Sequence, residues 1–175
     1  LEVQIVALPR IVNLSRREAD LAIGVSAPTA GRLVVQKLTD YRLHLAASED
    51  YLARHPPIRS RADLSRHRIV GYIPDMIFDK ELDYLSEIGL EKPTLGSNSV
   101  SVQINWIRGG GGVGFVHDFA LPFFPNVKRI LENEVRLTRS FYLVRHEDDK
   151  RLERLNRFAE ELSEGIRVEV QRLEA

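Results

Sequence analysis

The chain of 175 residues contains no cysteine, which excludes disulfide bonds, thiolate metal sites and a cysteine nucleophile. Its 25 Lys and Arg residues balance its 25 Asp and Glu residues, so that the formal net charge is zero. Nucleic acids are bound mainly through neutralisation of their phosphates, and we therefore do not expect this chain to hold DNA by itself. No apolar run approaches the length of a membrane span, and the first residues do not resemble a signal peptide.

Hydrophobic residues make up 43% of the chain and charged residues 29%, which is typical of a globular domain with a substantial core. The hydrophobic patterns alternate between the periods of strands and helices, and this alternation predicts an α/β fold. A turn at Thr39 and Asp40 is expected between two strands, and Ser48 is expected to cap a short helix. Strands are predicted over 3–8, 21–25, 33–38, 42–47, 68–73, 113–116, 127–131 and 140–145, and helices over 13–20, 79–88, 98–108 and 148–162.

Four segments resemble the effector-binding domain of LysR-type transcriptional regulators. They read LPRIVNLSRREADLAIGV (8–25), LTDYRLHLAASEDYLARHP (38–56), NSVSVQINWIRGGGGVGF (98–115) and SFYLVRHEDDKRLERL (140–155). The resemblance implies a two-lobed α/β domain of the type 2 periplasmic-binding-protein class, with a ligand cleft between the lobes. Lobe I is expected over 1–47 and 120–175 and lobe II over 48–119. The first strand and helix of lobe I and the winged helix-turn-helix that binds DNA are expected to lie outside this chain.

The start of helix 98–108 is the strongest candidate for a ligand contact. A helix start offers unpaired backbone N–H groups and a partial positive charge, which suit a carboxylate. Side-chain donors at this start are supplied by Ser97, Asn98, Ser99 and Ser101. The alternative is a helix that merely caps itself and binds nothing.

Three further candidates lie at the ends of predicted strands. Small residues after strand 21–25 let a ligand approach the backbone, although an ordinary loop explains them equally well; they are Gly24, Val25 and Ser26. Tyr72 and Ile73 end strand 68–73 and could form a wall of the pocket, or Tyr72 could simply belong to the edge of the core. His117 could pair with an anionic effector, although a histidine that is exposed or satisfied within the fold is the commoner case.

The resemblance implies a cytoplasmic regulatory domain that binds a small, anionic effector, for example a carboxylate, without cofactor, metal or catalytic residues. It also implies a homodimer in which strand 3–8 and helix 13–20 pack against lobe II of the partner, a tetramer of the full-length protein, and no membrane contact. Two alternatives stand beside it. One is a solute-binding protein of a transport system. The other is an enzyme built on His117 and Asp118, for which no third partner occurs at a recognisable spacing.

Overall fold

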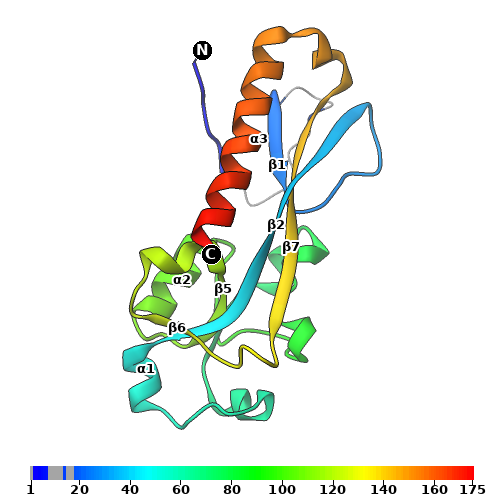
Figure 1. Ribbon diagram of the computed structural model, residues 1–175. Coiled ribbons are helices and arrows are strands. Elements are labelled where there is room, and N and C mark those ends of the chain that lie inside the picture. Colours follow the sequence, from blue (N-terminus) through cyan, green and yellow to red (C-terminus); the bar gives the residue numbers. More distant parts are fainter. Residues whose placement is uncertain (1, 8–13, 15–17) are drawn as a thin grey trace.

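The structure is a computed structural model that describes residues 2–7, 14 and 18–175. Its two longest strands, β2 (Leu33–Ser48) and β7 (Arg136–His146), pair antiparallel and run along the molecule (Figure 1). At the outer side of β7 lies β1 (Leu21–Gly24). On the far side of β2 the sheet continues through β5 (Val113–His117), β3 (Ile69–Gly71) and β4 (Leu95–Gly96), while β6 (Val127–Arg129) pairs with the end of β2. This mixed α/β arrangement confirms the predicted fold class.

Helix α3 (Glu153–Leu173) lies along one end of the β2–β7 pair (Figure 1). Its Ala159 packs with Leu38 of β2 and Leu143 of β7 in a small core cluster. The predicted start of the last helix, residue 148, was too early, because Glu147–Arg151 form a 3₁₀ turn before α3 begins. Among the described residues, no helix is both long and apolar enough to cross a membrane.

Helix α1 (Glu49–Arg54) begins directly after Ser48, as the sequence predicts, whereas α2 (Val100–Arg108) begins two residues later than the predicted 98 and ends at the predicted residue. Ser48 accepts a hydrogen bond from the backbone N–H of Tyr51, and Ser99 accepts one from the backbone N–H of Val102. Such bonds satisfy N–H groups that have no partner within the helix. Helix α2 then packs on the sheet through Ile104 and Ile107.

The predicted turn at Thr39 and Asp40 was wrong, because β2 is one continuous strand. Its pairing with β7 shifts register between Lys37 and Thr39, so that Leu38 is an extra residue in β2. A bulge of this kind bends a strand without ending it. Burial of Leu38 beneath α3, with 5% of its surface exposed, accounts for an apolar residue at this position.

The helix predicted over 79–88 is also absent from the described structure. Two separate 3₁₀ turns, Lys80–Leu82 and Ser86–Ile88, take its place. Asp79 still caps the first turn, and Gly89 still ends the second in a left-handed conformation with φ of 75°. The predicted bounds therefore coincide with a cap and a left-handed end, whereas Leu82, Leu85 and Ile88 between them pack into the core from separate turns and not from one helix.

Two predictions concern the beginning of the chain. Residues 3–7 form no strand and are exposed, because they have no neighbouring strand with which to pair in the described part. Of the helix predicted over 13–20, residues 18–20 are not helical, whereas 13 and 15–17 lie outside the described residues, as does Leu8.

The strands that carry the candidate site are parallel to one another. β3 pairs in parallel with both β4 and β5, so that their carboxyl ends reach the same edge of the sheet. Strand β5, in contrast, runs antiparallel to β2. The division into lobes at 47/48 and 119/120 stays a prediction; β2 crosses the first of these boundaries.

Candidate functional site

Three of the four predicted ligand-contact clusters meet at the edge of the sheet where the parallel strands end. Tyr72 follows β3, Ser97 follows β4, and His117 ends β5. The backbone N–H of Ser97 donates to the carbonyl oxygen of Gly71 at 3.0 Å, which ties the first two ends together. Ligands of open α/β sheets bind beside such carboxyl ends.

The turn before α2 is held by its own serines. The backbone N–H of Ser99 donates to Oγ of Ser97 at 3.1 Å. Nε2 of Gln103, one turn into the helix, donates to the carbonyl oxygen of Ser97 at 2.8 Å. Asn98 is half-buried in this turn, and Ser101 is exposed on the first turn of α2. The hydroxyls of Ser97 and Ser99 therefore already cap the backbone, which leaves Ser101 as the serine whose hydroxyl faces outward.

A cluster of aromatic rings lies behind this edge. Tyr72, Tyr84 and Phe115 make edge-to-face or tilted contacts at centroid distances of 5.7 to 5.8 Å. Burial raises the pKa of Tyr72 to about 12 and raises that of Tyr84 further, since a phenolate cannot be solvated there. Between these rings remains a cavity of about 10 Å³, room for about one water molecule. The tyrosine rings therefore fill most of the space between them, and the role of Tyr72 and Ile73 as ligand contacts stays a prediction.

His117 belongs to the same aromatic cluster. Its ring lies 5.3 Å from the ring of Tyr41 and 5.1 Å from that of Phe119. Burial lowers the pKa of His117 to about 4, although the neighbouring Asp118 acts in the opposite direction. At neutral pH the imidazole is uncharged, so that it offers a hydrogen bond and an aromatic face to a ligand but no positive charge.

A pocket of about 250 Å³ opens between the first turn of α2, the end of β5 and the following 3₁₀ segment, Asp118–Phe123. We call it the β5-end pocket. Two predicted site residues, Ser101 and His117, line it together with Val100, Ile104, Phe119 and Phe124. A pocket of this kind, mostly apolar with a few polar groups, is the usual form of a small-molecule site.

The fourth predicted cluster, Gly24 to Ser26, lies at the end of β1. Val25 packs against the core cluster that contains Tyr72 and Tyr84. The Ser26 hydroxyl donates a short hydrogen bond to a carboxylate oxygen of Asp79, in the connection between β3 and β4. Neither pocket is lined by these residues, so that their role as ligand contacts stays a prediction.

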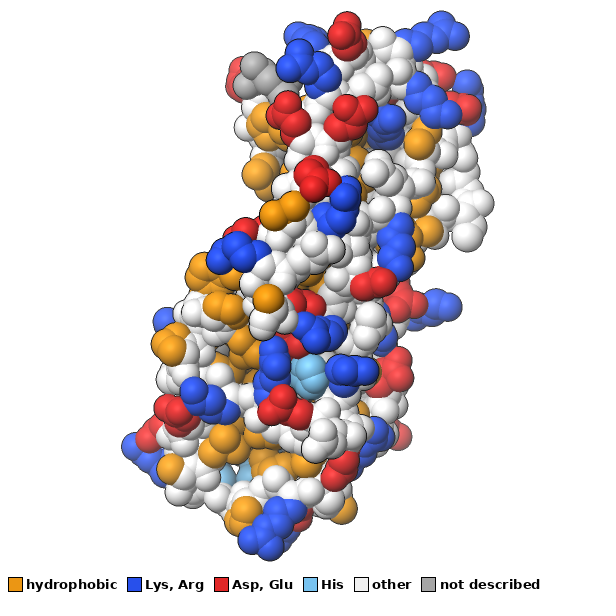
Figure 2. All heavy atoms as spheres, in the orientation of Figure 1, with side chains coloured by type: hydrophobic (Ala, Val, Ile, Leu, Met, Phe, Trp, Pro, Cys, Tyr) orange, Lys and Arg blue, Asp and Glu red, His pale blue; other side chains and the backbone are white. Residues whose placement is uncertain are grey.

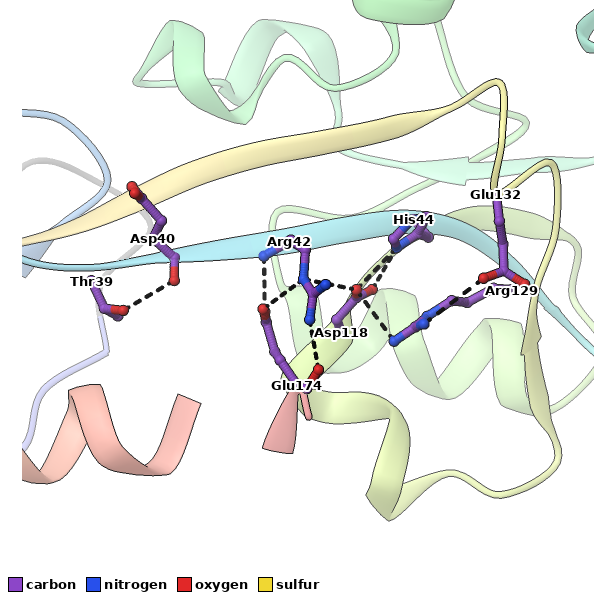
Figure 3. A network of polar contacts seen from close by, with 8 residues as sticks. All are labelled: Thr39, Asp40, Arg42, His44, Asp118, Arg129, Glu132 and Glu174. Atoms are coloured by element: carbon purple, nitrogen blue, oxygen red, sulfur yellow. Dashed lines mark hydrogen bonds and ion pairs between the residues drawn. The ribbon is translucent and has the colours of Figure 1, made fainter. Parts of the chain in front are cut away.

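Beside His117, the fully buried Asp118 is the centre of a polar network (Figure 3). Its Oδ1 lies 2.8 Å from Nδ1 of His44, and its Oδ2 lies 3.3 Å from a guanidinium nitrogen of Arg129 and 3.7 Å from Nε of Arg42. Arg42 also binds Glu174, just after α3, through its backbone N–H at 2.8 Å and its Nε at 2.9 Å. The network therefore connects the wall of the β5-end pocket with the end of α3.

The sequence interpretation missed several residues that shape the site. Phe119 and Phe124 line the β5-end pocket, and Gln103 orients the turn before α2. Gln103 carried a usable signal, since a polar residue within the apolar face formed with Val100, Ile104 and Ile107 indicates a buried hydrogen bond. The phenylalanines carried none, because nothing local distinguishes a ring that lines a pocket from a ring in the core.

A sequence profile described as the LysR substrate binding domain matches residues 1–167. A search of curated protein sequences finds no significant match. Among solved structures, the regulatory domain of CrgA, a LysR-type transcriptional regulator from Neisseria meningitidis, is similar with a TM-score of 0.76 and 22% identity, over 88% of this chain and 78% of that chain.

Two longer structures are similar as well. Full-length AphB, a virulence activator of Vibrio cholerae, has a TM-score of 0.64 and 18% identity, over 79% of this chain and 49% of that one. An OxyR mutant of Corynebacterium glutamicum has a TM-score of 0.65 and 16% identity, over 91% of this chain and 52% of that one. The chain thus spans about half the length of these proteins. At such low identities the likeness establishes a shared fold.

Proposed function

Because this chain belongs to the family of LysR substrate-binding domains, we propose that it is the effector-sensing part of a DNA-binding transcriptional regulator. A small anionic molecule binds between the two lobes and alters transcription through a DNA-binding domain that is not part of these residues. The protein acts in the cytoplasm, where its DNA is, and assembles as a dimer or a tetramer. The interface formed by 3–8 and 13–20 against lobe II of a partner belongs to this proposal.

The observation that carries the proposal is the meeting of three strand ends with the start of α2. The turn before α2 is rigid, since Ser97, Ser99 and Gln103 hold it by hydrogen bonds. A rigid helix start presents in fixed positions the backbone N–H groups that its own serines do not cap, and these suit a carboxylate. A ligand placed there alters the protein only through its different affinities for two arrangements of the lobes.

The effector site is tested with the 175-residue chain and a panel of small carboxylic acids, measured by thermal shift and isothermal titration calorimetry. We expect at least one acid to raise Tm, and we expect Ser101→Glu to weaken its binding at least tenfold. The new carboxylate repels an anion at the start of α2, yet it leaves the helix stable, because a negative charge is favourable at this position.

Ser65→Glu is the matched control, since it adds the same charge to an exposed serine in the separate 3₁₀ segment Arg61–Arg66. It should leave binding unchanged. Stabilisation by amines alone, or equal binding by the two glutamate variants, would contradict an anion site at α2. Deletion of the gene separates regulation from transport: a regulator's loss changes transcription of target genes, whereas a transport protein's loss abolishes uptake of the ligand.

A further inference from the structure

The lining of the β5-end pocket indicates more about the effector than its negative charge. Its walls come from the first turn of α2, the end of β5 and the segment that follows β5, and its side chains include Val100, Ile104, Phe119 and Phe124. Figure 2 shows hydrophobic side chains gathered at the surface over α2, beside the end of α3. Val100, at the rim, keeps 38% of its surface exposed. The pocket is therefore open to solvent and largely apolar.

Charge is missing from this lining. Of the residues around the pocket, only Ser101 and His117 are polar, and His117 is neutral at physiological pH because burial lowers its pKa to about 4. Arg42 and Arg129 face Asp118 instead, and the guanidinium of Arg108 lies over the ring of Phe124, 6.0 Å from its centroid, without belonging to the lining. A carboxylate placed inside would lose its hydration without gaining a charged partner, which is strongly unfavourable.

The size and shape of the pocket favour a ring or a branched alkyl group as its occupant. The volume of about 250 Å³ exceeds the roughly 150 Å³ of an apolar cavity that binds benzene. Phe119 and His117 stand 5.1 Å apart with their planes tilted by 41°, a geometry in which a third ring finds both edges and faces to contact. The start of α2 forms the rim of the same pocket, within reach of a polar group attached to that ring.

We propose that the β5-end pocket receives the aromatic or branched aliphatic end of the effector, whose carboxylate faces the start of α2. The effector is accordingly an aryl-substituted or branched-chain monocarboxylic acid and not a short dicarboxylate. This inference rests on the proposed function, because it specifies the apolar part of the same ligand.

The single tryptophan provides the measurement. Trp106 lies on α2 and packs against the core cluster of Ile104 and Val116, which also line the pocket. Its fluorescence is titrated in the 175-residue chain with phenylacetate, acetate, succinate and the neutral benzyl alcohol. Calorimetry on the same samples confirms that any fluorescence change reflects binding.

Val100→Phe and Val102→Phe form a matched pair of variants. Both valines lie on the first turn of α2 with similar exposure, 38% and 40%, but only Val100 lines the pocket. Phenylacetate should bind at least tenfold more tightly than acetate or succinate. Val100→Phe should weaken the binding of phenylacetate and of benzyl alcohol at least tenfold, whereas Val102→Phe should leave both affinities unchanged. Ala120→Leu, which fills the pocket from the segment after β5, repeats the test if Val100→Phe does not fold.

The outcomes separate this inference from the proposed function. Succinate binding as tightly as phenylacetate, or equal behaviour of the two phenylalanine variants, overturns the apolar pocket and leaves an anion-binding regulator in place. A third outcome is that benzyl alcohol binds, that Val100→Phe abolishes this binding, and that no acid binds more tightly than the alcohol. This outcome supports the apolar pocket and overturns the anionic effector. Absence of binding by both aromatic probes overturns the inference.

Discussion

The carboxyl group of Asp118 is fully enclosed and faces three side chains that carry or can accept a positive charge (Figure 3). They come from β2 and β6, so that one side chain joins the segment after β5 to two neighbouring strands. A buried charge is tolerated when partners and hydrogen bonds compensate its lost hydration, and removal of one partner leaves the others uncompensated. At the scale of single residues, we expect substitutions in this network and at His117 to change the stability of the protein most.

Asp118→Asn should lower the free energy of unfolding by about 2–3 kcal/mol, because the side chain keeps its shape but loses its charge. Urea denaturation at pH 7.5 measures this. Asp75→Asn is the control, since Asp75 is exposed, and its effect should stay within about 0.5 kcal/mol. Equal stabilities of the two variants would show that the Asp118 network contributes little.

His117 should make the protein less stable as the pH falls. Its pKa is lowered to about 4 in the folded chain, whereas an unfolded histidine titrates near 6.5, so that the unfolded state binds the proton between these values. Stability from this residue is complete above the unfolded pKa and should fall by about 2 kcal/mol between pH 7.5 and pH 5.

His117→Phe keeps a ring at this position and removes the titration. Urea denaturation at the two pH values should therefore show a smaller loss of stability in the variant than in the parent chain. His67, whose pKa is also lowered by burial, remains in both proteins and contributes to the pH dependence of stability that is left in the variant. An equal loss of stability between the two pH values in variant and parent would mean that His117 is solvated and titrates normally.

At the scale of elements, two glycines illustrate opposite constraints. Gly112 leads from α2 into β5, and a Cβ atom there would lie 2.3 Å from the carbonyl oxygen of Arg68. That oxygen also accepts a hydrogen bond from the backbone N–H of Val113 at 2.9 Å, which places β5 beside β3. Gly165 lies within α3, where nothing approaches within 4 Å of an added Cβ. The first glycine is required by close packing, whereas the second only weakens a helix.

Gly112→Ala should lower the free energy of unfolding by about 3 kcal/mol or more, since β5 must shift away from Arg68. Gly165→Ala should instead stabilise the chain by about 0.5–1 kcal/mol, because alanine loses less conformational entropy in a helix. Thermal unfolding followed by circular dichroism compares both with the parent. A tolerated alanine at 112 would contradict the close approach of the two backbones.

At the scale of the whole molecule, β2 and β7 join the two ends of the structure (Figure 1). Helix α3 packs on one end of this pair, and α2 covers the sheet toward the other. Arg42 and Glu174 add a contact between the end of α3 and the middle of β2. Neither end is complete without the shared strands, which favours a single cooperative unfolding transition.

Unfolding should therefore follow the same curve whichever end is observed. Fluorescence of Trp106 reports the region of α2, and circular dichroism at 222 nm is dominated by the 21 residues of α3. The two probes should give coincident urea transitions. Separate midpoints would show that the two ends unfold independently and that the β2–β7 pair does not couple them.

Much of the local structure was predictable from the sequence. Ser48 caps its helix as expected, Ser99 caps α2, and β5 begins at the predicted residue 113. These features depend on hydrogen bonds between residues two to four positions apart, and neighbours in the sequence suffice to specify them. The resemblance to LysR effector domains likewise identified the family from short segments.

Only the tertiary structure decided which of these elements pair and what they enclose. The bulge at Leu38 exists because β7 offers a continuous partner and α3 covers the extra side chain. Asp118 contacts His44 across 74 residues of sequence, and Glu174 binds Arg42 across 132 residues. Burial, charge compensation and the volume of the β5-end pocket depend on contacts between distant segments, and neither periodicity nor composition encodes those contacts at any single position.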